Sequence, residues 1–158
     1  SQHITSNSHR RQLRHLVEFA IAVEAAGNIV AKTLSPLALT RAKEGLHFST
    51  EGFSELEDMH DRIIANISLA SNVLVSRDVD IARQLVEEKS ELSRRQRKSR
   101  KSHLKRLAAG LAKSLETSDL HLETSLAFKE FNSQIATVAY PILSRKGKLL
   151  NSRLVEKD

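Results

Sequence analysis

Apolar residues recur at intervals of three and four positions along almost the whole chain of 158 residues. This spacing places them on one face of an α-helix, whereas a half-buried strand requires alternation of apolar and polar residues. The chain has only five glycines and two prolines, which excludes a fold rich in turns. We therefore predict an all-α fold without a β-sheet.

Four long helices are expected, and very short turns join the last three. Their ranges are 9–34, 50–75, 79–115 and 118–155. Ser35-Pro36 is expected to end the first helix, because the residue before a proline is disfavoured in the α region, and Pro141 to kink the last one. Ser49 or Thr50 is expected to cap the second helix and Asp78 the third, since side-chain oxygens accept from free N–H groups.

Helices joined by short turns run antiparallel to each other. The predicted architecture is thus an antiparallel up-down helical bundle over residues 49–157, with helix 9–34 packed against it. Residues 1–8 are polar and are expected to be a flexible segment, so that the helical domain covers 9–158.

Helix 9–34 carries an apolar stripe and is thin, because much of it is alanine. The stripe consists of Leu13, Leu16, Ala20, Val23, Gly27, Val30 and Leu34. We expect packing on the bundle to hide only part of it. Because a twofold axis lets a patch cover itself, we predict a homodimer in which this helix takes part.

Composition removes several classes of protein. Cysteine is absent, which excludes disulfides, thiolate chemistry and cysteine-based zinc sites. Tryptophan is absent and other aromatic residues are few, so stacking platforms for single-stranded nucleic acid are poorly supplied. The longest uncharged stretches, 63–76 and 131–144, are too short and too polar to span a bilayer.

Positive charge is concentrated in one window of the third expected helix. This basic stretch consists of Arg94, Arg95, Arg97, Lys98, Arg100, Lys101, Lys105 and Arg106, and it contains no acid. On a helix these residues point in every direction, so the stretch indicates either a solvated segment that can project past the bundle, or a site for anionic lipid or an acidic partner. No helix-turn-helix spacing accompanies it, so we do not expect nucleic acid as a partner.

Three spacings could place metal ligands. Glu57-x-x-His60 and Glu44-x-x-His47 match the spacing of di-iron carboxylate bundles, but such sites need the two motifs on different facing helices. Glu24 and Asn28 place two oxygen ligands one helical turn apart, or form a solvated pair. No nucleophile–base set, phosphate-binding glycine loop or nucleotide fingerprint is present, so we predict neither an enzyme nor a cofactor.

Several segments resemble one known family. The string NSQIATVAYPIL at 132–143 is the most specific, and FSTEGF at 48–53, HLKRL at 103–107 and VEAAGN at 23–28 follow the same order. Together they resemble the PhoU-like cytosolic domain at the C-terminus of bacterial sodium/phosphate cotransporters. In that family the domain is a pair of three-helix repeats, so 49–157 is similar to one repeat and 9–34 to the closing helix of the other.

The resemblance implies a function. It suggests a cytosolic regulatory and interaction domain of a sodium-dependent phosphate transporter, acting in phosphate uptake control. The chain itself would be soluble and lie on the cytoplasmic side of the inner membrane, and its partner would be the transporter membrane domain or another transport or regulatory protein. The alternatives are a metal-binding enzyme of the di-iron type and a basic helical protein that binds nucleic acid.

The resemblance also bears on metal binding. PhoU proteins bind metal clusters through Glu/Asp-x-x-x-Asp motifs. These motifs fall here on Glu24 and Asn28, and on Lys129 and Ser133. Acids are replaced at three of the four positions, so we do not expect an occupied cluster.

Overall fold

The computed structural model describes the backbone of residues 2–145 and the side chains of residues 6–144. The helices are α1 (Gln2–Ile29), a π-helical turn (Val30–Leu34), α2 (Ser35–Glu44), α3 (Thr50–Ser76), α4 (Val79–Ala108), α5 (Ala112–Glu116), α6 (Ser118–Ala136), a 3-10 turn (Thr137–Ala139) and α7 (Tyr140–Arg145). No strand occurs within these residues. The prediction of an all-α helical bundle is confirmed.

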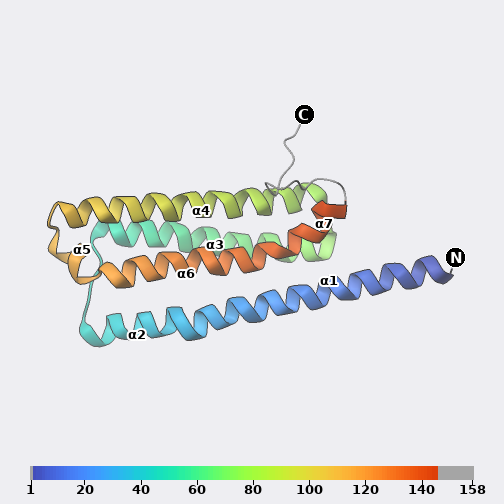
Figure 1. Cartoon of the computed structure of the whole chain (residues 1–158), viewed down its shortest axis with the longest axis horizontal. Helices are drawn as coiled ribbons and strands as arrows, with labels where there is room; N and C mark the ends of the chain where they lie inside the picture. Colours follow the sequence, from blue (N-terminus) through green and yellow to red (C-terminus); the bar gives the residue numbers. More distant parts are fainter. Residues whose placement is uncertain (1, 146–158) are drawn as a thin grey trace.

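The three helices α3, α4 and α6 form an antiparallel bundle, and α1 and α2 run along its outside as one rod (Figure 1). The rod contacts the bundle mainly through α6. The N-terminal part of α1 extends past the end of the bundle at which α3 turns into α4 (Figure 1). None of the helices in the described part of the chain is long and apolar enough to cross a membrane.

The first helix does not end at Ser35-Pro36, and this prediction is wrong. Helical structure continues from α1 into α2 through the π turn, in which the Ser35 N–H donates to the carbonyl oxygen of Val30, five residues earlier. Pro36 lies in the first turn of α2, where a missing N–H costs little. The rod ends instead at Gly45, whose φ of 62° is the left-handed conformation that favours glycine. At its other end the rod begins at Gln2, so residues 2–8 are helical, and their flexibility stays a prediction.

The N-terminal caps of α3 and α4 are the residues that the sequence predicts. Ser49 Oγ accepts from the Gly52 N–H at 3.1 Å, and Asp78 Oδ1 accepts from the N–H groups of Asp80 and Ile81 at 2.8 and 2.9 Å. These contacts satisfy N–H groups that have no partner inside the helix. The α3–α4 turn is closed by Arg77, a non-glycine residue with φ of 56°.

The last two expected helices are each interrupted. The helix expected over 79–115 ends at Ala108, and Gly110, with φ of 73°, leads into the short α5. The helix expected over 118–155 changes at Thr137 to a 3-10 turn that precedes Tyr140-Pro141. The kink predicted at Pro141 is therefore confirmed, and residues 146–155 lie outside the described part of the chain.

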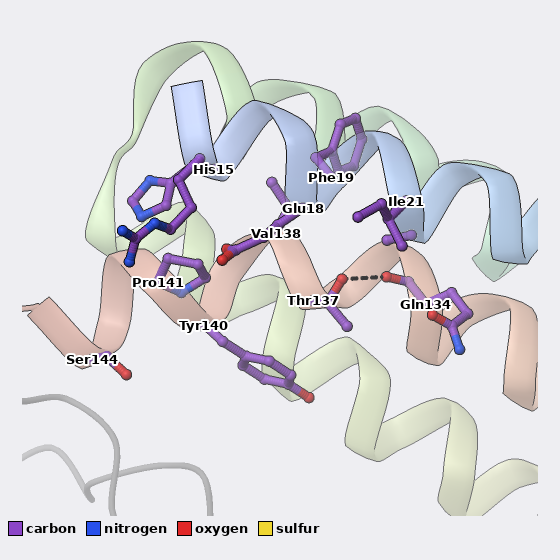
Figure 2. A pocket seen from close by; sticks show the side chains of 12 residues that line it. His15, Glu18, Phe19, Ile21, Gln134, Thr137, Val138, Tyr140, Pro141 and Ser144 are labelled. Carbon is purple, nitrogen blue, oxygen red and sulfur yellow. Dashed lines mark hydrogen bonds between the residues drawn. The ribbon is translucent and has the colours of Figure 1, made fainter. Parts of the chain in front are cut away.

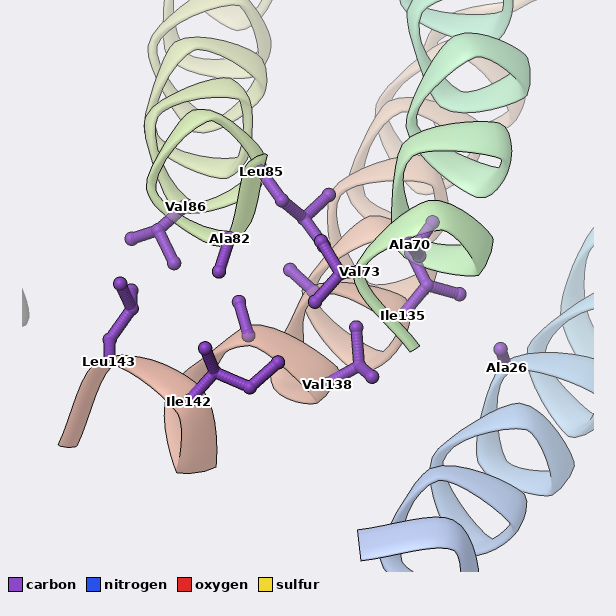
Figure 3. Packing of buried hydrophobic residues seen from close by; sticks show 12 residues of the cluster. Ala26, Ala70, Val73, Ala82, Leu85, Val86, Ile135, Val138, Ile142 and Leu143 are labelled. Carbon is purple, nitrogen blue, oxygen red and sulfur yellow. The ribbon is translucent and has the colours of Figure 1, made fainter. Parts of the chain in front are cut away.

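The apolar core lies at the end of the bundle where α3 turns into α4 (Figure 3). Ala70 and Val73 of α3, Leu85 of α4 and Ile135 of α6 meet there, and Leu143 of α7 covers the end. Farther along the bundle a smaller cluster joins Met59, Ile63 and Leu92. Beyond that cluster the interior becomes polar, and this polar part holds the groups of chemical interest.

Candidate functional site

Helix α4 carries the basic stretch, and one of its faces is buried. Leu92, Gln96, Ser99 and His103 follow one another at intervals of three and four residues, and all four are buried. Three of the four are polar, so a search for apolar residues finds no core face there. The stretch packs against α3 and α6 and does not project past the bundle.

Glu55 of α3 is the centre of a polar layer inside this part of the bundle. The Arg106 guanidinium donates to both of its oxygens, with Nη1 at 2.8 Å from Oε1 and Nη2 at 3.1 Å from Oε2. Ser99 Oγ donates to Oε2 at 2.7 Å. Burial raises the pKa of Glu55, but its contacts with His121, Arg106 and Ser99 outweigh burial and hold the pKa at about 2. Glu55 is therefore a carboxylate that ties α3 to α4.

Two buried histidines stack within the same layer. The rings of His103 on α4 and His121 on α6 have centroids 4.6 Å apart and are inclined by only 9°. His103 Nε2 lies 3.0 Å from Ser118 Oγ, and His121 Nε2 lies 3.4 Å from Glu55 Oε2. Burial and the neighbouring His121 and Arg106 lower the pKa of His103, so its neutral form is favoured.

The absence of a side chain at Gly52 allows Ser49, His121 and Arg106 to pack closely around this position. A Cβ at position 52 would lie 3.0 Å from Ser49 Oγ, 3.3 Å from His121 Cδ2 and 3.5 Å from an Arg106 nitrogen. A side chain would thus displace the cap of α3 and the ring of His121. We missed this layer in the sequence because its signal is polar: Ser99, His103 and Arg106 share a helical face with Leu92, at three- and four-residue spacing.

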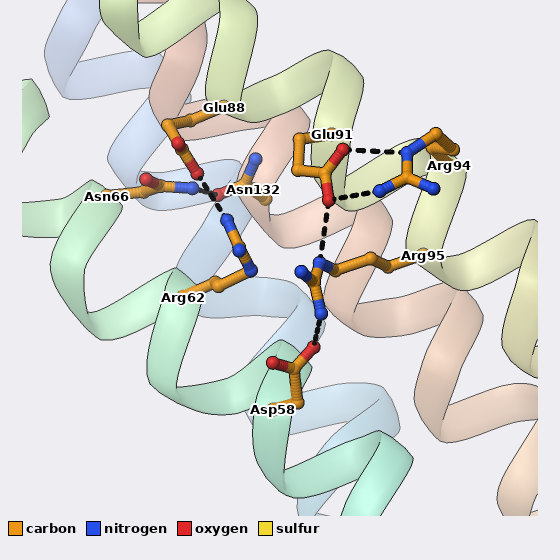
Figure 4. Close-up of polar contacts among 8 residues, drawn as sticks. All are labelled: Asp58, Arg62, Asn66, Glu88, Glu91, Arg94, Arg95 and Asn132. Carbon is orange, nitrogen blue, oxygen red and sulfur yellow. Dashed lines mark hydrogen bonds and ion pairs between the residues drawn. The ribbon is translucent and has the colours of Figure 1, made fainter.

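A second network joins α3 and α4 nearer the middle of the bundle (Figure 4). Arg95 donates to Asp58 at 2.5 Å and to Glu91 at 2.8 Å, and Glu91 also accepts from Arg94. Beside it, Arg62 pairs with Glu88 at 3.0 Å. The structure thus engages Arg95, one of the predicted partner-binding residues, in contacts between helices.

Asn66 of α3 and Asn132 of α6 form a buried polar contact next to this network (Figure 4). The Asn66 Nδ2 donates to the Asn132 Oδ1 at 2.9 Å. Both side chains are almost completely buried, so the contact fixes the relative position of two core helices.

Five of the eight predicted partner-binding cations form a free basic surface on the outer side of α4. We call this set the α4 basic surface, and it consists of Arg97, Lys98, Arg100, Lys101 and Lys105. All five are exposed, and their charged groups form no hydrogen bond or ion pair with the side chains of residues 6–144, which are the ones that the structure describes. Arg94 is exposed beside them but pairs with Glu91. Helix α4 therefore has a polar face in the bundle and a cationic face toward solvent.

A hollow of about 330 Å³ lies between α3 and α4. The exposed Lys98 lines it together with Asp58 and with Glu55 and Ser99 of the polar layer. One cation of the α4 basic surface thus lies beside the polar layer, with two carboxylates in the same lining.

A larger hollow of about 610 Å³ separates α1 from the end of α6 and α7 (Figure 2). Phe19 and Ile21 line it from α1, and Val138 and Pro141 line it from the opposite side. Tyr140 points away from α1 and its hydroxyl accepts from Lys89 of α4 at 2.5 Å. The exposed surface of the lining is mainly apolar, although His15 and Glu18 of α1 also contribute to it.

The predicted metal ligands do not converge. Glu24 and Asn28 both lie exposed on α1, and His60 is exposed on α3. Glu44 ends α2 and His47 follows it in the connection, outside the bundle. Among the described residues no three His, Cys, Asp or Glu side chains are grouped so that they could hold a metal ion.

The fold and the site thus define a helical bundle with a polar interior and a free basic surface. No protein-family model matches the chain, and no solved structure matches it significantly. The chain is 33% identical over 135 residues to the "Putative inorganic phosphate export protein YjbB" of Salmonella typhimurium, and 30% identical over 135 residues to the protein of that name in Escherichia coli K12.

These similarities cover 85% of this chain but only 25% of each relative. The chain thus spans about a quarter of the length of the curated relatives it matches. The names of the relatives specify phosphate export, whereas the resemblance predicted a role in uptake, and they do not mention sodium. The link to phosphate is common to both.

Proposed function

We propose that this chain is a regulatory and interaction domain of an inorganic phosphate transport protein, and that it acts by docking rather than by catalysis. The similarity to the two phosphate export proteins supports the link to phosphate. Their names favour control of export over the uptake that the resemblance suggested. Dependence on sodium remains part of the proposal through the resemblance alone.

The observation that carries the docking mechanism is the α4 basic surface. Its five cations have no acidic partner among the described residues. The neighbouring Arg62, Arg95 and Arg106, in contrast, each pair with an acid of α3 or α4. A cation near an anionic membrane surface gains about 1 kcal/mol. We infer that α4 lies against anionic lipid headgroups on the cytoplasmic side of the inner membrane, beside the membrane domain of the transporter.

Vesicle binding tests the docking step. In a variant with Arg97, Lys98, Lys101 and Lys105 all replaced by Gln, affinity for vesicles that contain phosphatidylglycerol should fall by more than about 100-fold. Binding of the unchanged chain should also weaken steeply with salt, because salt screens such contacts.

A matched variant distinguishes the effect of the α4 basic surface on vesicle binding from the effect of net charge alone. Arg10, Arg11 and Arg14 on α1 and Lys32 in the π turn are four exposed cations, and their replacement by Gln removes the same charge. This variant should keep most of its affinity. An equal loss in both variants would mean that net charge alone drives binding, and the docking surface would be refuted.

The transport step is tested in the organism that encodes the chain. The same four substitutions on α4 are introduced at the chromosomal gene, and release of labelled phosphate from preloaded cells is measured. We expect a changed rate of phosphate release. An unchanged rate together with lost vesicle binding would contradict a regulatory role of the surface.

A further inference from the structure

The end of α4 and the short helix α5 form an exposed apolar surface at one end of the bundle (Figure 1). We call it the α5 tip, and it consists of Leu104, Ala108, Ala109, Gly110, Leu111, Ala112 and Leu115. All of these residues are exposed, and the exposed fractions of the three leucine residues are, in chain order, 49%, 42% and 71%. Apolar residues that gather on an exposed surface mark a site of interaction.

The segment 111–117, which contains α5, buries polar residues and exposes leucines, the reverse of an ordinary surface helix. Ser114 and Thr117 are only 1% and 2% exposed, whereas Leu111 and Leu115 face solvent. The Ser114 Oγ has no hydrogen-bond partner among the described residues. Folding alone favours the opposite placement, because exposing a leucine and burying an unpartnered hydroxyl both cost free energy. The outward position of the leucines therefore fits a role outside the fold.

The α5 tip continues the α4 basic surface along the same side of α4. Four residues, two from each surface, follow one another at intervals of three and four: Arg97, Lys101, Leu104 and Ala108. They therefore share one side of the helix. Gly110, with φ of 73°, then lets the chain turn from α4 into α5. The outer side of α4 thus changes from cationic to apolar toward its C-terminal end.

The charges around the α5 tip indicate a lipid surface as its partner. Residues 104–115 include Lys105 and Lys113 but no acid, and Glu116 is the first acid after them. Both lysines are exposed and form no ion pair with the described side chains of residues 6–144. Leucines flanked by cations are typical of segments that lie in the interface of an anionic membrane without spanning it. Lysine side chains are long enough to stay at the phosphates while the leucines beside them enter the apolar layer.

We propose that the α5 tip inserts into the boundary between headgroups and acyl chains of an anionic membrane. Leu104, Leu111 and Leu115 enter the acyl region, and Lys105 and Lys113 remain at the lipid phosphates. Insertion of this kind reaches about 5–10 Å into the bilayer. The inference rests on the proposed docking of α4, and it adds an orientation, in which α4 lies along the membrane and its C-terminal end enters it.

A fluorescent label tests insertion directly. The chain contains no cysteine, so a single introduced cysteine can carry an environment-sensitive fluorophore. Ala112→Cys places the label on the α5 tip, and Ser68→Cys places it on the exposed side of α3 as a control. With vesicles that contain phosphatidylglycerol, the emission at position 112 should shift to shorter wavelength. Lipids with a nitroxide on the acyl chain should quench it, whereas the label at position 68 should show neither effect.

A matched pair of uncharged variants measures the contribution of the leucines. Leu104→Gln combined with Leu115→Gln should weaken vesicle binding by about 10-fold or more, because even one leucine that leaves water contributes this much. The control combines Leu13→Gln and Ile64→Gln, at positions that are 62% and 52% exposed on α1 and α3. It should bind like the unchanged chain. All four side chains are exposed, so both variants should keep their helical circular dichroism.

The outcomes distinguish insertion from docking. Vesicle binding without a wavelength shift or quenching at position 112 would overturn insertion and leave docking by the α4 basic surface in place. A failure of the unchanged chain to bind the vesicles would refute the docking itself. A shift that occurs without vesicles and grows with protein concentration would assign the α5 tip to a second copy of the chain, and would also overturn insertion.

Discussion

The imidazole rings of His103 and His121 lie one above the other inside the bundle, with centroids 4.6 Å apart. Two stacked rings so close together resist a double positive charge, and Arg106 adds a third cation nearby. Glu55 is the carboxylate that contacts this group, and Arg106 already engages both of its oxygens. The arrangement therefore makes the stability of the fold depend on pH.

Acidification should lower the free energy of unfolding in a first step below pH 6.5. The pKa of His103 is lowered from its usual 6.5 in the folded chain, so the unfolded chain binds the proton more readily. Stability from this residue is thus present above pH 6.5 and falls as the pH drops below it. Urea unfolding across a pH series measures the effect. His103→Gln should flatten this step, and an unchanged slope would contradict the role of the ring.

Stronger acid should act through Glu55. Its pKa is about 2 in the folded chain against 4.5 ordinarily, so its contribution is present above pH 4.5 and is lost as the pH falls toward 2. Glu55→Gln should remove this second step while leaving the first in place. Loss of both steps together would show that the two groups titrate as one unit.

Breaking the Glu55–Arg106 pair should be costly at neutral pH. Only 10% of the Arg106 side chain is exposed, so Glu55→Gln leaves a mostly buried cation without its counter-charge. We expect a loss on the order of 3 kcal/mol in the free energy of unfolding. Asp61→Asn, at an exposed position on α3, should change it by less than about 0.5 kcal/mol. The double variant Glu55→Met with Arg106→Met should cost less than the sum of its single changes.

A side chain at Gly52 should strain the polar layer. Gly52→Val would press against Ser49 Oγ and His121 Cδ2, and overpacking of this kind costs about 1–3 kcal/mol. Ser68→Val on the exposed side of the same helix carries no such cost. Thermal melting compares the two variants, and equal midpoints would show that the layer yields without strain.

The α4 basic surface should be removable without loss of stability, whereas Arg95 should not. Arg97, Lys98, Lys101 and Lys105 touch no acid among the described residues, so their replacement by Gln should leave the melting temperature nearly unchanged. Adding Arg95→Gln removes contacts with Asp58 and Glu91 and should lower it. A drop of equal size in both variants would mean that the outer cations contribute to the fold.

The periodicity of apolar residues predicts most helix positions because each core helix must bury one side. It fails at Pro36, because a π turn supplies hydrogen bonds that an unbroken α-helix could not make there. It also fails along α4, where the bundle is filled by Gln96, Ser99 and His103, residues that a search for apolar side chains passes over.

The basic stretch shows a related limit. Its charges are equivalent in the sequence, and only the rotation of α4 separates Arg95 and Arg106, which pair with acids of α3, from the exposed cations. Asp58 and Glu55 lie far from Arg95 and Arg106 along the chain, so the sequence does not indicate that these residues pair. The exposure of the apolar stripe of α1 at Leu13, Leu16 and Val23, in contrast, follows from its own pattern, because the helix is apolar on more sides than one bundle can cover.

The interior of the bundle changes from apolar at the α3–α4 turn to charged at the opposite end, and the two ends therefore respond to different conditions. Cooling weakens the burial of Val73, Leu85 and Leu143, because the hydrophobic driving force fades at low temperature. Dissolved ions act farther along the bundle, on the more accessible charged contact between Arg95 of α4 and Asp58 of α3. Cold and ionic strength thus act on different parts of one three-helix unit, so that one part can loosen while the other holds the helices together.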